Sequence, residues 1–125
     1  PARVLIVDDN QDGAELMAEL LRMSGYEVAA AYDGVDGLAQ AERWRPDVIV
    51  LDLGMPKLDG YGMCRALRAS PWGQGMQVLA LSGWGQPSDR LRTQQAGFDQ
   101  HLVKPVDPDA LIAAIAQALA TKPGA

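Results

Sequence analysis

Cysteine and histidine are nearly missing from this chain of 125 residues, which holds one of each, Cys64 and His101. A single cysteine excludes an internal disulfide bond. One cysteine and one histidine also cannot supply the sulfur and nitrogen ligands that zinc prefers. Any metal ion bound by this chain is therefore expected to be held by oxygen atoms.

Long hydrophobic runs and clusters of basic residues are missing as well. No apolar run approaches the roughly 18 residues that a membrane span needs, and the opening residues PARVLIVDDN lack the regions of a signal peptide. The chain has 11 Lys and Arg against 16 Asp and Glu, a formal net charge of -5, and its basic residues are scattered. We therefore expect a cytoplasmic segment that contacts neither a membrane nor nucleic acid.

The composition is that of a folded domain. Hydrophobic residues make up 48% of the chain and charged residues 22%, close to the average of globular proteins. A length of 125 residues fits one hydrophobic core, so we expect residues 1–125 to form a single domain. The spacing of Cys64 on a predicted helix indicates a residue that fills the core.

Short apolar segments alternate with segments of helical spacing. We expect five strands, at residues 4–7, 28–31, 48–51, 78–81 and 102–103, most of them continuously hydrophobic as in a sheet covered on both faces. Five helices are expected between and after them. The first starts near residues 10–12 and stops at 24–25, the second carries Val35 and ends before Pro46, the third opens near 59–60 and ends before 70, the fourth lies around 88–95, and the fifth begins after Asp107-Pro108. Leu16 and Val35 are expected among the apolar residues of the first two helices. This alternation predicts an α/β fold, a doubly wound five-stranded parallel sheet, for which we take the strand order 2-1-3-4-5.

Polar residues follow four of the predicted strands. Asp8 and Asp9 follow the first strand, Asp52 the third, Ser82 the fourth and Lys104 the fifth. In doubly wound sheets ligands bind outside the carboxyl ends of the strands, and in this strand order the first and third strands are neighbours. We therefore expect three carboxylates in one pocket.

Three carboxylates this close repel one another unless a positive group lies among them. Mg²⁺ takes oxygen ligands, keeps several waters and suits this small set of donors better than Ca²⁺ does. We predict Mg²⁺ held by Asp9, Asp52 and the Gly54 carbonyl, with Asp8 reaching it through water. A carboxylate in this setting can act as a nucleophile and form an aspartyl phosphate. The Lys104 ammonium and the Ser82 hydroxyl are then suited to contact the phosphate oxygens.

Four motifs, VLIVDDN, VLDLGMPKLDG, LALSGWG and HLVKPV, resemble in their order and spacing the receiver domain of two-component response regulators. The resemblance covers essentially the whole chain. It implies a CheY-like, flavodoxin-like fold in which Asp52 is the Mg²⁺-dependent phosphoacceptor, supplied by a phosphohistidine on a histidine kinase or histidine phosphotransfer domain. It also implies that Ser82 is the switch hydroxyl, that Lys104 contacts the phosphate, and that the Lys104-Pro105 bond is cis.

The resemblance further implies a signalling output. Phosphorylation is expected to reshape the face formed by the fourth helix, fifth strand and fifth helix, which an effector domain in the same or another chain would read. Such a domain catalyses its own phosphorylation and dephosphorylation without being a conventional enzyme. The motifs are equally compatible with a stand-alone receiver and with a receiver from a longer protein, such as a hybrid sensor histidine kinase.

One position departs from the family pattern. The switch position on the fifth strand is usually Tyr or Phe, whereas this chain has His101. A histidine can still turn between buried and exposed positions, but its charge changes near neutral pH. We therefore expect a switch that is either weakly sensitive to pH or muted.

Other functions fit the residues less well. A phosphohydrolase of the haloacid dehalogenase type uses a second Asp two residues after its nucleophile, but position 54 is Gly. A degenerate receiver that binds partners without phosphorylation would not need this full set of site residues. A carrier of flavin mononucleotide needs a hydroxyl-rich phosphate loop after the first strand, and the acidic DDNQDG would repel a phosphate.

Overall fold

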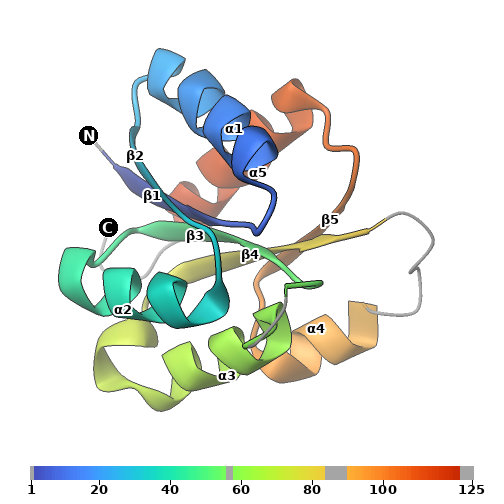
Figure 1. Ribbon diagram of the computed structural model, residues 1–125. Helices are drawn as coiled ribbons and strands as arrows, with labels where there is room; N and C mark the ends of the chain where they lie inside the picture. The colour runs from blue at the N-terminus through green and yellow to red at the C-terminus, as the bar shows by residue number, and fades with distance from the viewer. Residues whose placement is uncertain (1, 56–57, 84–89, 122–125) are drawn as a thin grey trace.

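The computed structural model describes residues 2–55, 58–83 and 90–121. Within these residues the chain forms a five-stranded parallel sheet in the order β2-β1-β3-β4-β5, with helices on both faces (Figure 1). The strands are β1 (Arg3–Val7), β2 (Glu27–Ala31), β3 (Val48–Asp52), β4 (Gln77–Ser82) and β5 (Gln100–Val103). The helices are α1 (Gln11–Met23), α2 (Gly34–Trp44), α3 (Gly60–Ala69), α4 (Arg90–Ala96) and α5 (Pro108–Thr121). The predicted doubly wound α/β fold and its strand order are confirmed.

The central residues of β1, β3 and β4 are apolar because both faces of the sheet are covered. Side chains alternate between the two faces along β1, so that Val4 and Ile6 enter one core cluster and Leu5 and Val7 the other. α1 and α5 cover the first cluster, while α2, α3 and α4 cover the second (Figure 1). All four side chains are fully buried. Burial of each contributes roughly 1.5–3 kcal/mol through the hydrophobic effect.

The first three helices begin at polar side chains that accept a hydrogen bond from the helix backbone. These caps are Asn10, Asp33 and Asp59. Each such cap contributes about 1 kcal/mol and fixes where the preceding loop ends. The caps at Asn10 and Asp59 follow β1 and β3, so they also fix the loops at the carboxyl edge of the sheet.

Some elements differ from the prediction. β5 begins at Gln100, two residues before the apolar pair that predicts it, because Gln100 and His101 pair with β4 through their backbone. A short 3-10 helix, η1 (Pro71–Gly73), forms in a segment predicted as loop. The predicted start of the fourth helix at Ser88 lies outside the described residues.

Two apolar residues predicted on helix faces lie in solvent. Leu16 is 63% exposed and Val35 is 58% exposed. α1 instead packs on the sheet through Ala14, Ala18 and Leu21, and the small alanines let it approach closely. None of the described helices is long and apolar enough to cross a membrane.

Arg68 on α3 fixes the segments that lead into β4 and β5. Its guanidinium forms an ion pair with Asp99 at 2.8 Å, and Asp99 also accepts a hydrogen bond from the Val78 N–H at 2.8 Å. The same guanidinium donates to the backbone carbonyls of Gly73, Gln74, Met76 and Gly97. These bonds tie the start of β5 to α3 and so position the residues that follow Asp99.

Candidate functional site

Three carboxylates meet at the carboxyl edge of the sheet, where β1 and β3 lie side by side. Asp8 and Asp9 follow β1, and Asp52 is the last residue of β3. One oxygen of each lies within 4.8 Å of one oxygen of the other two. Asp8 is 2% exposed and Asp52 is 7% exposed, whereas Asp9 is open to solvent. The structure thus brings together the three acids that the sequence predicts in one pocket.

Lys104 brings a positive charge to the two buried acids. Its Nζ lies 3.0 Å from Asp8 Oδ2 and 3.3 Å from Asp52 Oδ2. Lys104 follows β5, and β4 separates β5 from β3, so its side chain reaches across the end of β4. The Lys104-Pro105 peptide bond is cis, as the resemblance implies. When all four side chains are ionised they carry three negative charges and one positive charge, so the cluster has a net negative charge.

The pKa values of Asp52 and Lys104 reflect this net negative charge. Burial raises the pKa of Asp52 and the nearby Asp8 raises it further, while the Gly54 N–H and Lys104 oppose the change. Burial alone would lower the pKa of Lys104, but its hydrogen bond to Asp8 and the charges of both acids outweigh burial and raise it. Lys104 therefore stays charged, and a further cation beside Asp52 would favour its ionised form.

Backbone N–H groups hold the two buried carboxylates in place. The Asn10 N–H donates to Asp8 Oδ1 at 3.0 Å, and the Gly54 N–H donates to Asp52 Oδ1 at 3.2 Å. In each case the donor lies two residues after the acid, the arrangement of an Asx-turn. Both oxygens of Asp8 thus have a partner, Asn10 for one and Lys104 for the other. The same holds for Asp52, whose two oxygens face the Gly54 N–H and the Lys104 ammonium.

Gly60 has a role at this site that the sequence does not reveal. A Cβ at position 60 would lie 2.6 Å from the Asp52 carbonyl oxygen and 2.8 Å from Leu53 Cα, so only glycine lets α3 begin directly on this backbone. At Gly54, by contrast, a Cβ would meet Asp52 Oδ1 at 3.9 Å, which is ordinary contact. Nothing in the sequence separates the two glycines, because the close approach is a tertiary contact. The Gly54 carbonyl remains a predicted ligand.

Ser82 links this site to β5. It is fully buried at the end of β4, one residue beyond Leu81, which pairs with Asp52. Its carbonyl accepts a hydrogen bond from the Lys104 N–H at 2.9 Å. Its hydroxyl lies 2.7 Å from Nε2 of His101. The two predicted switch residues are therefore in direct contact, which the sequence alone could not indicate.

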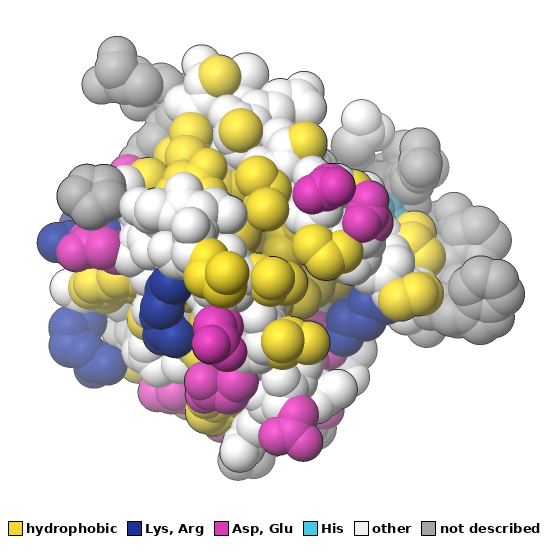
Figure 2. Space-filling view, turned by 90° about the horizontal axis from the view of Figure 1, so that it is seen from above, with side chains coloured by type: hydrophobic (Ala, Val, Ile, Leu, Met, Phe, Trp, Pro, Cys, Tyr) yellow, Lys and Arg dark blue, Asp and Glu magenta, His cyan; other side chains and the backbone are white. Residues whose placement is uncertain are grey.

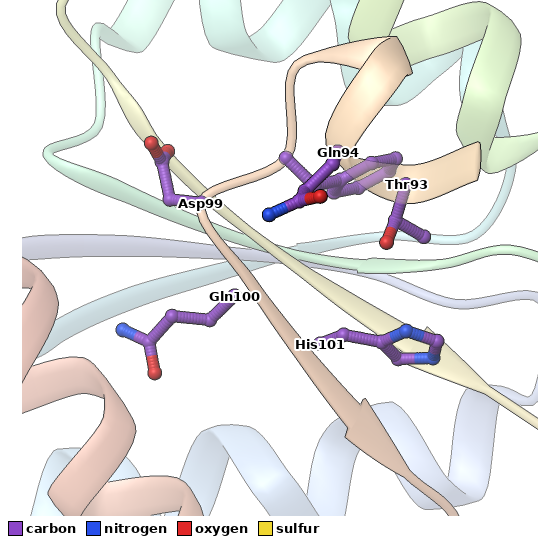
Figure 3. Close-up of a pocket in the computed structure, with 6 residues that line it drawn as sticks. Thr93, Gln94, Asp99, Gln100 and His101 are labelled. Carbon is purple, nitrogen blue, oxygen red and sulfur yellow. The ribbon is translucent and has the colours of Figure 1, made fainter. Parts of the chain in front are cut away.

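A cavity of about 380 Å³ lies between α4 and β5, and His101 is one of its lining residues. In Figure 3, Thr93 and Gln94 extend from α4, while Gln100 and His101 leave β5 in opposite directions. Gln100 donates to the Ala114 carbonyl of α5 at 2.9 Å. A displacement of His101 would therefore change the surface between α4 and β5.

An apolar groove of about 460 Å³ runs from the acidic cluster along α1. Asp8 and Lys104 line one end, and Leu16, Met17 and Val106 supply apolar lining. Figure 2 shows hydrophobic side chains gathered across the face that α1 and α5 form, with acidic side chains around them. The acidic cluster therefore opens beside an apolar surface.

Comparison with known sequences agrees with the resemblance that the sequence motifs carry. Residues 4–116 match the family model described as the response regulator receiver domain. The DNA-binding dual master transcriptional regulator RpaA of Synechocystis is 38% identical over 113 residues, which cover 90% of this chain and 47% of that protein. The chain spans about half the length of the curated relatives it matches.

Solved structures of similar proteins share the fold. The chemotaxis response regulator CheY4 of Vibrio cholerae is 32% identical with a TM-score of 0.88, and the match covers 94% of this chain and 98% of that one. The signal receiver domain of a signal transduction histidine kinase from Syntrophus aciditrophicus is 28% identical with a TM-score of 0.90. That match covers 100% of this chain and 95% of that one.

Proposed function

The chain belongs to the response regulator receiver domain family, whose role is to accept phosphoryl groups in two-component signalling, and on that premise we propose that Asp52 is the acceptor. The observation that carries the proposal is the contact of Lys104 with the buried Asp8 and Asp52 at 3.0 and 3.3 Å. β3 lies between β1 and β4 in the sheet. A phosphoryl group on Asp52 would therefore have acids for a metal ion on one side and Ser82 and Lys104 on the other.

The donor is a phosphohistidine on a histidine kinase or a histidine phosphotransfer domain. The ionised Asp52 carboxylate attacks phosphorus, a P–O bond forms as the P–N bond breaks, and the imidazole of the donor leaves. Lys104 turns its ammonium from the carboxylates to an oxygen of the transferred group, and the Ser82 hydroxyl donates to another. Catalysis of this kind is mainly positioning and charge neutralisation.

The site residues fit Mg²⁺. Exposed Asp9, the Asp52 carboxylate and the Gly54 carbonyl are oxygen donors of the kind Mg²⁺ prefers, and we assign Asp8 a contact through water. When bound, Mg²⁺ supplies positive charge against the acids and the transferring phosphoryl group. A positive charge beside Asp52 would lower its raised pKa.

An effector would then recognise the phosphorylated state at the surface formed by α4, β5 and α5. An aspartyl phosphate adds strong acceptor oxygens beside β4, and drawing the Ser82 hydroxyl toward them changes its contact with His101. The effector that responds lies in the same protein or another chain. We take residues 1–125 as one receiver domain and assign it no DNA contact of its own.

A phosphohydrolase is the weaker alternative. Its chemistry needs a general acid near the nucleophile, whereas position 54 is Gly and its N–H instead donates to Asp52 Oδ1.

Incubation with acetyl phosphate and Mg²⁺, followed by intact-mass measurement, tests the proposal. The wild type and Asp109→Asn, which changes an exposed acid on α5, should each gain one phosphoryl group. Asp52→Asn, and the wild type with a chelator in place of Mg²⁺, should gain none. Uptake that survives Asp52→Asn would place the acceptor elsewhere. No uptake in any sample would mean a receiver that binds partners without phosphorylation.

A further inference from the structure

The Ser82 hydroxyl has one proton, and His101 competes for it. The 2.7 Å contact between Ser82 Oγ and His101 Nε2 is a hydrogen bond whose direction depends on the imidazole. When Nε2 carries no proton, Ser82 must donate to the ring. When Nε2 is protonated, the ring donates to Ser82 and the hydroxyl proton is released for another acceptor.

A phosphoryl group is such an acceptor. Its oxygens cannot donate to Ser82, so Ser82 can bond to them only with its single proton. Because Ser82 is fully buried at the end of β4, water does not substitute for either partner. The hydroxyl can therefore bond to the phosphoryl group and to His101 together only if His101 donates.

We infer that His101 is a positioning residue for phosphoryl recognition: with a proton on Nε2 it directs the hydroxyl proton of Ser82 toward the phosphoryl group on Asp52. The inference rests on the proposed acceptor. A neutral imidazole meets the condition in only one of its two tautomers, whereas the imidazolium always meets it. Phosphoryl binding and protonation of His101 therefore favour each other, as linkage requires of two coupled equilibria.

Three charged side chains near β5 have partners of their own. Asp99 pairs with Arg68 of α3 at 2.8 Å, and Arg92 of α4 lies 3.9 Å from the centre of the Tyr61 ring. Lys104, beyond the end of β5, pairs with Asp8 and Asp52. On β4 the neighbouring residues, Ala80 and Ser82, do not titrate near neutral pH. Of the two groups in the Ser82 contact, His101 is the one whose charge changes in this range.

The single histidine makes this coupling measurable. Its ring C–H proton resonance reports His101 alone, so an NMR titration from about pH 5 to pH 8 follows its protonation without assignment. Beryllofluoride with Mg²⁺ serves as the phosphoryl analogue, and Mg²⁺ alone as the reference. We expect the titration midpoint to rise when beryllofluoride is added, by the amount that corresponds to about 3- to 10-fold tighter binding to protonated His101.

Two variants separate the hydrogen bond from simple charge attraction. Ser82→Ala keeps the imidazolium near the anion but has no hydroxyl, and it should lose most of the midpoint rise. His101→Phe keeps the hydroxyl but has no ring nitrogen, so the gain in beryllofluoride affinity between about pH 8 and pH 6, measured against the wild type, should disappear.

Different outcomes test the positioning role of His101 and the identity of the acceptor. An unchanged midpoint in the wild type, or a rise that Ser82→Ala leaves intact, would overturn the positioning role of His101 while beryllofluoride still binds. Failure of beryllofluoride to bind the wild type at any pH would overturn the proposed acceptor itself.

Discussion

Asp52 is a buried carboxylate whose surroundings disfavour its charged form. It is 7% exposed, shares its pocket with two further acids, and has a pKa raised first by burial and then by Asp8. Protonation therefore favours the folded state more than the unfolded one. The stability from this residue is present at low pH and is lost as the pH rises through the raised pKa.

Replacing Asp52 by Asn should stabilise the metal-free protein at neutral pH. The variant has no charge to bury, so we expect its free energy of unfolding at pH 7 to exceed that of the wild type by about 1 kcal/mol, the size of a typical single-residue effect. The difference should shrink as the pH falls toward 3.8, the ordinary pKa of Asp. Urea denaturation at both pH values measures it, with Asp109→Asn as the control. A variant less stable than the wild type at pH 7 would mean that the Lys104 pair outweighs the cost of burial.

For single residues, the sequence predicts which side chains share the site but not the contacts that they make with one another. The acids and Lys104 are predictable because each directly follows an apolar strand, and the carboxyl ends of parallel strands share one edge of the sheet. The contact between Ser82 and His101, and the need for glycine at position 60, depend on distances between separate elements. No local pattern encodes such distances.

Among the elements, α1 links the site to the surface that a donor must cover. A protein that brings its phosphohistidine to Asp52 has to lie over the neighbouring surface, and the groove along α1 and Val106 is the apolar part that continues from Asp8 and Lys104. Leu16 lines this groove and is 63% exposed. We expect the donor protein to pack against it.

Substitution of Leu16 tests this role of α1. Leu16→Glu should slow phosphoryl transfer from a phosphorylated histidine kinase about 10-fold, the loss expected for an apolar contact in an interface, and should leave uptake from acetyl phosphate unchanged. Met23→Glu is the matched control, because Met23 is 80% exposed on the same helix, two turns further from the site. Equal slowing by both substitutions would argue against a local contact at Leu16, as would normal transfer to Leu16→Glu.

The elements themselves are largely predictable, with informative exceptions. Caps at Asn10 and Asp59 begin α1 and α3 where the sequence predicts. β5 starts earlier than predicted because its first two residues, Gln100 and His101, are polar and pair through their backbone alone. Leu16 lies in solvent although it fits the helical spacing, since alanines bring α1 close to the sheet.

For the whole molecule, the strand order is what assembles the site. With β1 beside β3, and β4 and β5 on the far side of β3, residues almost a hundred positions apart, such as Asp8 and Lys104, come within 3.0 Å. The alternation of strands and helices predicts a parallel sheet, and the family resemblance supports the order that the structure confirms. The family match spans residues 4–116 and so includes residues of all five strands and the four clustered side chains.

We propose that, of the three clustered acids, Asp52 receives the phosphoryl group. The most direct test is to phosphorylate the wild type with acetyl phosphate and Mg²⁺, reduce the acyl phosphate with borohydride, and locate the reduced residue by peptide mass mapping. We expect reduction at position 52 alone, and none when the chelated sample is treated in the same way. Reduction at Asp8 or Asp9 instead would contradict it.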